Sequence, residues 1–489
     1  MFLSVALVAA VAFREPVVVP PIRDLSYRED VEVRLDAKTE VVVRSPAADA
    51  ASWVSGHFKT WYGFDANVVA DVSKMAETLG SERYRLKVEP GRIEICADGL
   101  QGVRYAMYTL RQVAERLSSG RTVAGYRLPQ MTADDAPVLG WRGVHLCWFP
   151  EMKATQIERE IRLAAYYKFN FAVVETWGTF ESERNPWLSV DKPPMTKAEL
   201  KRLKAIADDL GITLVPGFNV FGHAVGARSR SGKHVTLDRF PEHASLFEPV
   251  GGWNWCLANP EATAVVKETV AELHEAFGNP PFFHIGCDEA AHPSCASCRA
   301  GSYAEKIRAH VGAIHGLLAG RGARCLIWRS MLLPQGDKHY DGYYPGPRGY
   351  EDTVRFGETL PRDVVVCDAC YGEPHETYPM LEHFRSRGHD TVTCPWDNVK
   401  GIRSQAAFAR REGIFGLLQT TWHHYWGIAF ADMMVEASVG SWSDKPFDGR
   451  SIEWLDFATH WRQCSQDAGV TDFDEFGYSD NQSNRKLVD

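Results

Sequence analysis

The sequence lacks the features that would point to nucleic-acid or membrane partners. It has no polybasic run, and its net charge of −9 arises from both signs mixed along the chain. No run beyond the N-terminal one approaches the length and apolarity of a membrane helix, and there is no solenoid-type repeat or low-complexity stretch. These absences exclude a polybasic nucleic-acid binder, a helical membrane protein and a repeat scaffold.

The composition is that of a globular protein with room for two or three domains. The chain has 489 residues, of which 45% are hydrophobic and 24% charged. Fifteen Trp and seventeen Tyr are a generous supply of flat aromatic faces, which can stack on sugar rings. The alternative, that most of these rings fill the core, stays open at this point.

The N-terminus and the cysteines bear on the compartment. Residues 2–12 (FLSVALVAAVA) are too short to span a bilayer and end in small residues. Residues 1–12 therefore resemble a signal peptide, which predicts secretion or a periplasmic location. A buried first strand in a cytoplasmic protein is the alternative. Eleven cysteines, an odd number, leave at least one thiol unpaired within a monomer and do not decide between the two.

Residues 25–135 are predicted to form a small α+β domain. Two alternating runs, 84–88 and 93–95, flank a Pro90-Gly91 turn and predict a hairpin. Apolar residues at helical spacing from Val103 to Leu117 predict a helix that packs on this sheet. The prolines and acids between Leu128 and Pro137 favour a domain boundary there.

Residues 138–445 repeat a pattern of strand followed by helix. Eight strands are expected, at 141–147, 170–175, 212–218, 281–286, 324–328, 364–368, 390–395 and 415–421. Helix starts are indicated by Thr155 with Glu158, Thr196 with Glu199, Ser302 with Glu305, and Asn259-Pro260. The predicted fold class is α/β, a (β/α)8 TIM barrel preceded by the small α+β domain. Residues 446–489 are expected to form a C-terminal helix and a tail.

The segment PFFHIGCDEA, residues 281–290, is the most informative in the chain. An apolar run of strand length ends in two adjacent carboxylates, Asp288 and Glu289. Neighbouring acids resist burial, so they are expected at the mouth of the barrel, where different surroundings would allow them different roles. A solvated loop after a strand is the alternative interpretation.

Other strand ends are also rich in polar and aromatic residues. Together they predict a pocket for a neutral polyol, with rings that stack and side chains that hydrogen-bond to hydroxyls. These residues include Arg142, His145, Glu175, Asn219, His223, Trp328, Asp368, Tyr371, Trp396, Asp397, Trp422 and His424.

His284-Ile285-Gly286-Cys287-Asp288-Glu289 resembles the His-x-Gly-x-Asp-Glu signature of glycoside hydrolase family 20, the β-N-acetylhexosaminidases. The resemblance extends over about residues 30–430. It includes YRLKVEPGRIEICADGLQGVRYAMYTLRQ, the WRG at 141–143, Lys168-x-Asn170, Gly222-His223, Cys256-Leu257 and Asn259-Pro260. The chain departs from the main branch at Asn219, Glu175 and Trp422-His423-His424, and its pattern is closer to the hexosaminidase D-like branch.

The resemblance implies an exo-acting, retaining enzyme that removes terminal β-linked GlcNAc or GalNAc and needs no cofactor. Glu289 would protonate the leaving oxygen, the substrate's 2-acetamido group would be the nucleophile, and Asp288 would orient that group. The expected substrate-binding residues are Arg142, Glu175, His223, His284, Trp328, Trp396, Trp422 and His424. His424, in place of an acid, predicts tolerance of an axial 4-hydroxyl and hence acceptance of GalNAc.

A second cluster suggests a structural metal. Cys287, His292, Cys295 and Cys298 lie within twelve residues, and Cys295-x-x-Cys298 has the spacing of a zinc knuckle, which Cys367-x-x-Cys370 repeats. Disulfides or free thiols are the alternatives.

Two other functions stay open from the sequence. One is an amino-sugar-binding barrel that has lost turnover. The other is a metal-dependent barrel hydrolase that uses His145, Glu175, His223 and Asp288.

Overall fold

The computed structural model describes most of the chain. The described residues are 13–72, 80–119, 122–150, 152–189, 195–225, 236–249, 251–343, 348–424, 427–444, 452 and 454–470. The predicted signal peptide and the tail beyond residue 470 lie outside the described residues, so both stay predictions. The chain divides into two compact units.

The first unit is built on a mixed sheet. Its strands are β1 (Asp24–Leu35), β2 (Glu40–Arg44), β3 (Asn67–Ala70), β4 (Tyr84–Glu89), β5 (Arg92–Ala97), β6 (Glu115–Ser119) and β7 (Thr122–Asp135). The order is β1-β7-β4-β5-β2-β3, and β6 pairs with β7. The predicted hairpin is present as β4 and β5, with Leu86 opposite Ile95 and Val88 opposite Ile93.

The described part of this unit has two helices, α1 (Ala50–Tyr62) and α2 (Leu100–Val113), and α2 packs on β4 and β5 as predicted. However, α2 is shorter than expected. Ala114 is already extended, and Leu117 belongs to strand β6, where pairing with β7 outweighs its helical spacing. Most of the stretch from Leu128 to Pro137, where a domain boundary was predicted, belongs to β7. The first unit ends at Val138 and also includes residues 166–168 and 442–452.

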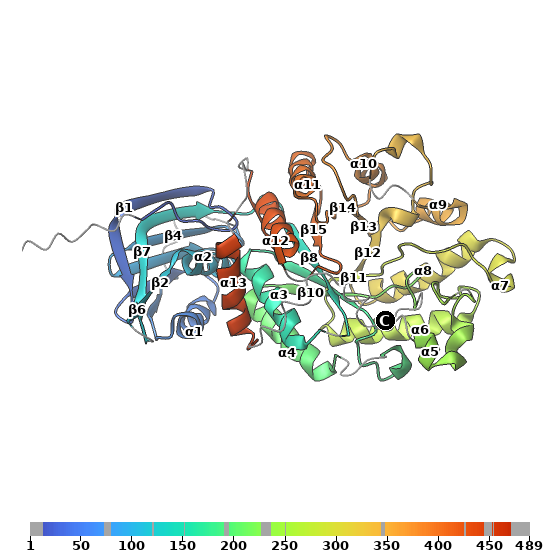
Figure 1. The fold of residues 1–489 in the computed structure, drawn as a ribbon, viewed down its shortest axis with the longest axis horizontal. Coiled ribbons are helices and arrows are strands. Elements are labelled where there is room, and N and C mark those ends of the chain that lie inside the picture. The colour runs from blue at the N-terminus through green and yellow to red at the C-terminus, as the bar shows by residue number, and fades with distance from the viewer. Residues whose placement is uncertain are drawn as a thin grey trace, which may run out of the picture. The chain divides into compact units, whose positions relative to one another are not determined.

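In the second unit, eight parallel strands of the described chain close into a barrel (Figure 1). They are β8 (Trp141–Trp148), β9 (Phe171–Thr176), β10 (Thr213–Gly217), β11 (Phe282–His284), β12 (Arg324–Trp328), β13 (Val365–Asp368), β14 (Thr391–Thr393) and β15 (Gly416–Thr420). All eight predicted strands are present, and the (β/α)8 fold class is confirmed. The strands are nearly continuous apolar runs because both faces of a barrel strand are covered.

A helix follows each barrel strand. These helices are α3 (Ala154–Tyr166), α4 (Lys197–Leu210), α6 (Pro260–Ala276), α8 (Tyr303–Ala319), α9 (Glu351–Glu358), α10 (Pro379–Ser386), α11 (Val399–Glu412) and α12 (Gly427–Trp442). The predicted caps at Thr196, Asn259 and Ser302 are present. The cap predicted at Thr155 is wrong, because α3 already begins at Ala154. A terminal helix, α13 (Trp454–Asp467), follows the barrel as expected.

The barrel interior is layered. Aromatic rings from the strand starts pack together at one end, with Trp141 and Phe171 at 4.9 Å between centroids. Toward the carboxyl ends of the strands the lining becomes polar, with His145 4.8 Å from Trp422 and 5.6 Å from Trp328. The mouth therefore combines polar and aromatic groups, as in barrels whose sites lie at this end. Among the described residues, no helix has the length and apolarity to cross a membrane.

Candidate active site

The acidic segment is a coil of left-handed backbone at the end of β11. The φ angles of Gly286, Cys287 and Glu289 are 67°, 70° and 47°. The amide of Trp328 donates to the Gly286 carbonyl at 3.0 Å, which fixes the coil to the next strand. Left-handed conformations cost energy for non-glycine residues and occur often at functional sites. They end the strand earlier than predicted and bring Asp288 and Glu289 to the mouth.

Two glycines let this coil pack against the loop after β10. A Cβ on Gly286 would lie 1.7 Å from Asn219 Oδ1, and one on Gly222 would lie 2.2 Å from the Asp288 carbonyl oxygen. No larger residue fits at either position without displacing the backbone or Asn219. The Gly222-His223 pair in the sequence thus has a physical reason, because Gly222 lets His223 reach the two acids.

Asp288 and Glu289 have different surroundings. The side chain of Asp288 is 14% exposed, whereas that of Glu289 is 44% exposed. His223 Nε2 lies between them, 3.5 Å from Asp288 Oδ2 and 3.3 Å from Glu289 Oε2. Arg348 Nη1 is 2.5 Å from Glu289 Oε1. The pair is therefore asymmetric, with one shielded carboxylate and one reachable from solvent.

The contacts of Glu289 favour its ionised form. The hydrogen bond with His223, which outweighs the opposing effect of partial burial, and the charge of Arg348 lower the pKa of Glu289 below its usual value. A group that donates a proton at neutral pH needs a higher pKa than this. In this conformation Glu289 is therefore ionised and paired.

Beneath the acids lies a buried hydrogen-bonded chain. Glu175 Oε2 is 3.0 Å from His145 Nε2, and the Asn219 amide donates to Glu175 Oε1 at 2.8 Å. All three residues are buried. Both oxygens of Glu175 have protein partners, so the structure does not support the prediction that Glu175 binds substrate. Its contacts instead hold Asn219 against Gly286.

Two of the predicted tryptophans form a wall of the mouth. The Trp328 and Trp422 rings are 5.5 Å apart at an angle of 40°. The Trp422 indole N–H donates to the Tyr371 hydroxyl at 2.6 Å, and Trp422 itself has a φ of 46°. Burial raises the pKa of Tyr371, so its hydroxyl stays protonated. This contact orients the Trp422 ring.

The remaining predicted binding residues at the mouth fall into two places. Trp396 and His424 are neighbours, with ring centroids at 5.7 Å, and His424 Nε2 is 3.8 Å from Asp397 Oδ2. His284 lies deeper, 4.3 Å from the Trp328 ring, and accepts a hydrogen bond from the Gly286 amide. Burial lowers the pKa of His284 to about 3, so it is a neutral support rather than a charged binding group.

The prediction that Arg142 holds sugar hydroxyls needs correction. Arg142 is at the start of β8, the end away from the acids, and its guanidinium donates to the Leu139 carbonyl at 2.6 Å. Side chains alternate along a strand, and Trp141 and His145 face the interior. Arg142 therefore faces outward, because it is an odd number of residues from both.

Sequence reasoning missed two residues at the mouth. Arg348 contacts Glu289, and the Trp253 indole N–H donates to the Glu289 carbonyl at 2.6 Å. Neither lies at a strand end or in a recognisable spacing. Only the fold could reveal them.

The predicted metal ligands are partly wrong. Cys295 and Cys298 cluster with Cys256 and Glu248, not with Cys287 and His292. The buried Cys287 thiol donates to the Ile285 carbonyl, and the ring of His292 packs against that of Tyr350 with centroids 4.0 Å apart and the planes tilted by 31°. One other group of possible ligands occurs in the described chain, His145, Cys147 and Glu175. Neither group contains His223 or Asp288, which the metal-dependent hydrolase hypothesis requires.

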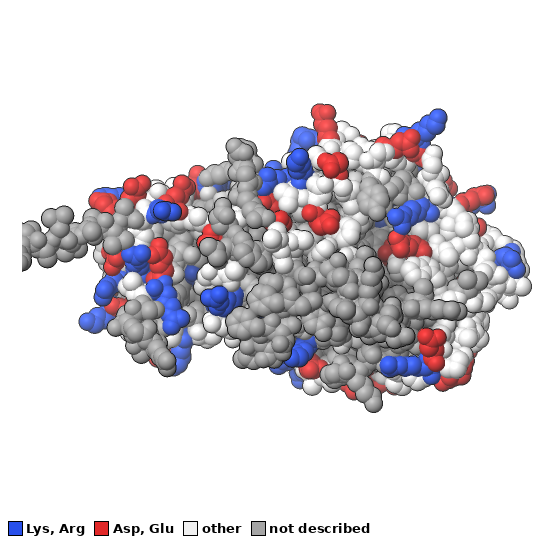
Figure 2. All heavy atoms as spheres, in the orientation of Figure 1, with Lys and Arg blue, Asp and Glu red and all other residues white. Residues whose placement is uncertain are grey.

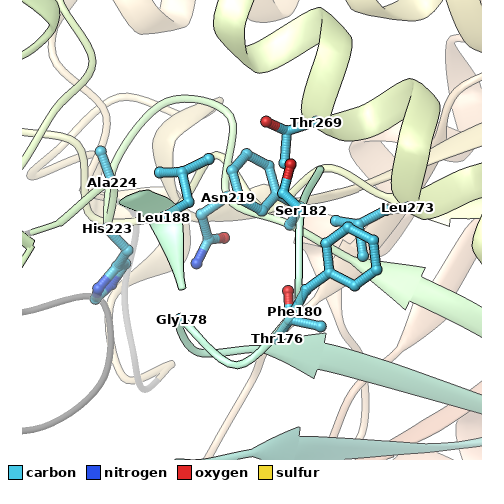
Figure 3. A pocket seen from close by; sticks show the side chains of 11 residues that line it. Thr176, Gly178, Phe180, Ser182, Leu188, Asn219, His223, Ala224, Thr269 and Leu273 are labelled. Atoms are coloured by element: carbon cyan, nitrogen blue, oxygen red, sulfur yellow. The ribbon is translucent and has the colours of Figure 1, made fainter. Parts of the chain in front are cut away.

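A hollow borders the site on its helix side (Figure 3). Its lining joins the loops after β9 and β10 to helix α6 and consists of Thr176, Gly178, Phe180, Ser182, Leu188, Phe218, Asn219, His223, Ala224, Thr269 and Leu273. Neither Asp288 nor Glu289 lines the hollow, so it adjoins the site through Asn219 and His223.

The visible surface carries both charge signs. On the face drawn in Figure 2, Lys and Arg side chains of the described residues are interspersed with Asp and Glu. This agrees with the mixed charge pattern of the sequence.

Comparison with known proteins gives one consistent match. Residues 15–136 match the family described as glycosyl hydrolase family 20, domain 2. A β-hexosaminidase of Vibrio furnissii is 25% identical over 295 residues, which are 54% of this chain and 47% of that protein. One from Akkermansia muciniphila is 24% identical over 309 residues, 56% of this chain and 59% of that protein. The chain thus spans about half the length of these relatives.

Solved structures support the same fold. The exo β-N-acetylglucosaminidase of Vibrio harveyi, in complex with N-acetylglucosamine, has a TM-score of 0.69 at 17% identity, covering 94% of this chain and 79% of that one. The β-N-acetylhexosaminidase of Bacteroides fragilis has a TM-score of 0.66 at 18% identity, covering 95% and 97%. The first unit thus matches a domain of glycoside hydrolase family 20, and the chain shares the fold of these solved structures over 94–95% of its length.

Proposed function

We propose that this protein is an exo-β-N-acetylhexosaminidase that removes terminal β-linked GlcNAc or GalNAc with net retention. The observation that carries the proposal is the asymmetric pair at the mouth of the barrel, the shielded Asp288 beside the accessible Glu289. The names of the relatives and the N-acetylglucosamine bound to the V. harveyi structure support the substrate class.

The two carboxylates suit different steps of substrate-assisted cleavage. The carbonyl oxygen of the substrate's 2-acetamido group attacks the anomeric carbon as the glycosidic bond breaks, and Glu289 donates its proton to the departing oxygen. Positive charge develops on the acetamido nitrogen, and the shielded Asp288 can stabilise it. Water then opens the cyclic intermediate, with Glu289 acting as the base, which restores the configuration.

The aromatic wall would hold the acetamido group. Trp328 and Trp422 present ring faces beside the acids, and Tyr371 fixes the orientation of Trp422. Trp396 and His424 are assigned to the sugar ring and its 4-hydroxyl. Since His424 replaces an acid, we expect GalNAc to be cleaved at least as well as GlcNAc, and a strict preference for GlcNAc would contradict this assignment.

Glu289 must be protonated before it can act as an acid. His223 and Arg348 oppose this in the resting conformation, because both favour the carboxylate. A bound substrate would have to displace or screen these contacts. Arg348 is the easier partner to displace, because its side chain is 45% exposed whereas that of His223 is 14% exposed.

A panel of aryl β-glycosides tests the nucleophile. The 2-acetamido sugars should be cleaved, whereas the matching glucoside and galactoside, which carry a 2-hydroxyl, should not. Equal rates on both would refute a nucleophile supplied by the substrate. No cleavage of any member, with N-acetylhexosamine still bound, would favour the binding-protein alternative.

Two variants test the division of roles. Glu289→Gln removes the proton donor, so turnover of poor leaving groups should fall by about 10²-fold or more, with a smaller loss for activated aryl groups. Asp288→Asn should slow good and poor leaving groups alike. Asp390→Asn, just before β14 at the opposite end of the barrel, is the control and should keep full activity. Leaving-group dependence in the Asp288 variant would reverse the assignment.

A further inference from the structure

Three thiols from two loops of the barrel converge on one point. Cys256 Sγ is 3.9 Å from Cys295 Sγ and 3.8 Å from Cys298 Sγ. A zinc ion holding thiolates at about 2.3 Å in a tetrahedron places its sulfurs about 3.8 Å apart, whereas a disulfide joins them at about 2.05 Å. The observed separations fit a shared metal and not a disulfide.

A buried carboxylate completes the group. One oxygen of Glu248 lies within 4.8 Å of all three sulfurs. Glu248 Oε2 accepts hydrogen bonds from the amide and hydroxyl of Ser294 and from the amide of Cys295. Its Oε1 is buried and has no hydrogen-bond partner among the described residues. A buried carboxylate oxygen without a partner is costly unless a cation occupies the site.

The backbone around the sulfurs suits thiolate ligands. The amide of Cys298 donates to Cys295 Sγ at 3.2 Å, and that of Ala258 donates to Cys298 Sγ at 3.4 Å. Such bonds offset part of the negative charge that three thiolates and a carboxylate leave around a divalent ion. Cys367 and Cys370 have the same sequence spacing but belong to no such group in the described chain.

The geometry points to a structural zinc site formed by Cys256, Cys295, Cys298 and Glu248. Sulfur-rich tetrahedral sites select zinc over harder cations. All four positions have a protein ligand, so the ion has no open position for catalysis. The site does not depend on the proposed glycosidase activity.

The site would tie together the two loops that carry the candidate active site. Cys256 belongs to the loop after β10, and Cys295 and Cys298 follow the acidic segment. Between the zinc ligands and the acids, Asn254 exchanges two hydrogen bonds with the backbone of Ala291. Trp253 donates to the Glu289 carbonyl. The ion would thus hold the backbone that positions Glu289 without touching substrate.

Elemental analysis of the full chain, purified without chelator, tests the site. We expect about one zinc per chain, reduced at least tenfold in Cys256→Ser and Cys298→Ser. Cys370→Ser is a control that changes the other Cys-x-x-Cys pair, which lies outside the proposed site. His292→Ala removes a ligand of the set that was predicted from the sequence. Both variants should keep the ion. Replacement by cobalt should give the visible absorption bands of a tetrahedral thiolate site, weakened in Glu248→Gln.

The outcomes are distinct. Zinc loss in His292→Ala but not in Cys256→Ser would overturn the ligand set. A chain that contains no zinc after zinc-supplemented growth, with these thiols free or joined as a disulfide, would overturn the site. Thermal unfolding should show a lower midpoint for Cys298→Ser than for Cys370→Ser, and equal midpoints together with equal zinc contents would also overturn it.

Discussion

Replacing Gly286 by alanine should damage both the stability and the proposed activity. The substitution forces a side chain into the left-handed backbone at φ 67° and places a Cβ 1.7 Å from Asn219 Oδ1. Asn219 would have to retreat by more than about 1 Å to reach an ordinary contact distance. That movement would break its 2.8 Å hydrogen bond to Glu175.

The magnitude follows from these two effects. An L-residue in the left-handed region costs about 1–2 kcal/mol, and a buried acceptor that loses its partner costs about 1–3 kcal/mol. We therefore expect Gly286→Ala to lower the unfolding free energy by about 2–5 kcal/mol. Because each kcal/mol shifts the midpoint of a large domain by about 2–4 °C, the expected loss is about 4–20 °C.

Gly413→Ala is the matched control. Gly413 ends helix α11 at φ 62°, and a Cβ there would have nothing within 4 Å. It should show only the backbone cost of about 1–2 kcal/mol and keep full turnover.

Gly286→Ala should also lose about 10²-fold in turnover, because a displacement of about 1 Å beside a reacting group has effects of that size.

Calorimetry and a chromogenic N-acetylhexosaminide assay measure the two losses. The Asn219→Ala background removes the clashing amide and leaves only the 3.1 Å contact with the Cα of residue 219, so Gly286→Ala should cost less in this background than in the unmodified chain. Equal midpoint losses in the two single glycine variants, with normal turnover in both, would show that the contact between Gly286 and Asn219 does not shape the site.

Two pH predictions and one packing prediction follow from the same geometry. Arg348→Met removes a charge that lowers the pKa of Glu289, so the alkaline limb of the kcat/KM profile should move to higher pH. Arg348→Lys should return this limb part of the way to its original pH. A shift to lower pH in Arg348→Met would contradict the pairing of Arg348 with Glu289. Burial lowers the pKa of His284 to about 3 in the folded protein, whereas in the unfolded chain it is about 6.5. As the pH falls below about 6.5, the unfolded chain therefore takes up a proton that the folded protein does not, and the unfolding free energy should decrease. Urea unfolding at several pH values measures this decrease. His284→Asn should flatten this fall, and parallel curves would exclude His284 as a cause. Tyr371→Phe removes the hydroxyl that accepts the hydrogen bond from the Trp422 indole, so KM for 2-acetamido substrates should rise. Circular dichroism should show an intact fold. An unchanged KM would show that this hydrogen bond does not orient the ring.

The barrel could be predicted from the sequence because its strands are short apolar runs separated by helices with clear caps. The mouth was harder to predict. The resemblance identified Arg142 as a binding residue by type, but its position relative to Trp141 and His145 puts it on the outer face. Side-chain alternation could have corrected this assignment once the strand bounds were known.

Contacts between distant loops could not be predicted from local spacing. Cys295 and Cys298 form a recognisable pair, but Cys256 is 39 residues before Cys295, and only the packing of two loops brings them together. Arg348 approaches Glu289 from a position 59 residues later. Glu175 was assigned to the substrate because it ends the second strand and was expected at the mouth with the other strand-end residues, but here both its oxygens have buried partners.

The left-handed residues at the mouth imply a conflict between heat resistance and turnover. Of the six described non-glycine residues with positive φ, four are His223, Cys287, Glu289 and Trp422. A library selected only for survival at high temperature should enrich Gly or Asn at these positions, where those residues relieve backbone strain. Each such substitution would gain stability but remove a side chain from the candidate site. Stabilising substitutions in this protein should therefore be sought at residues remote from the barrel mouth.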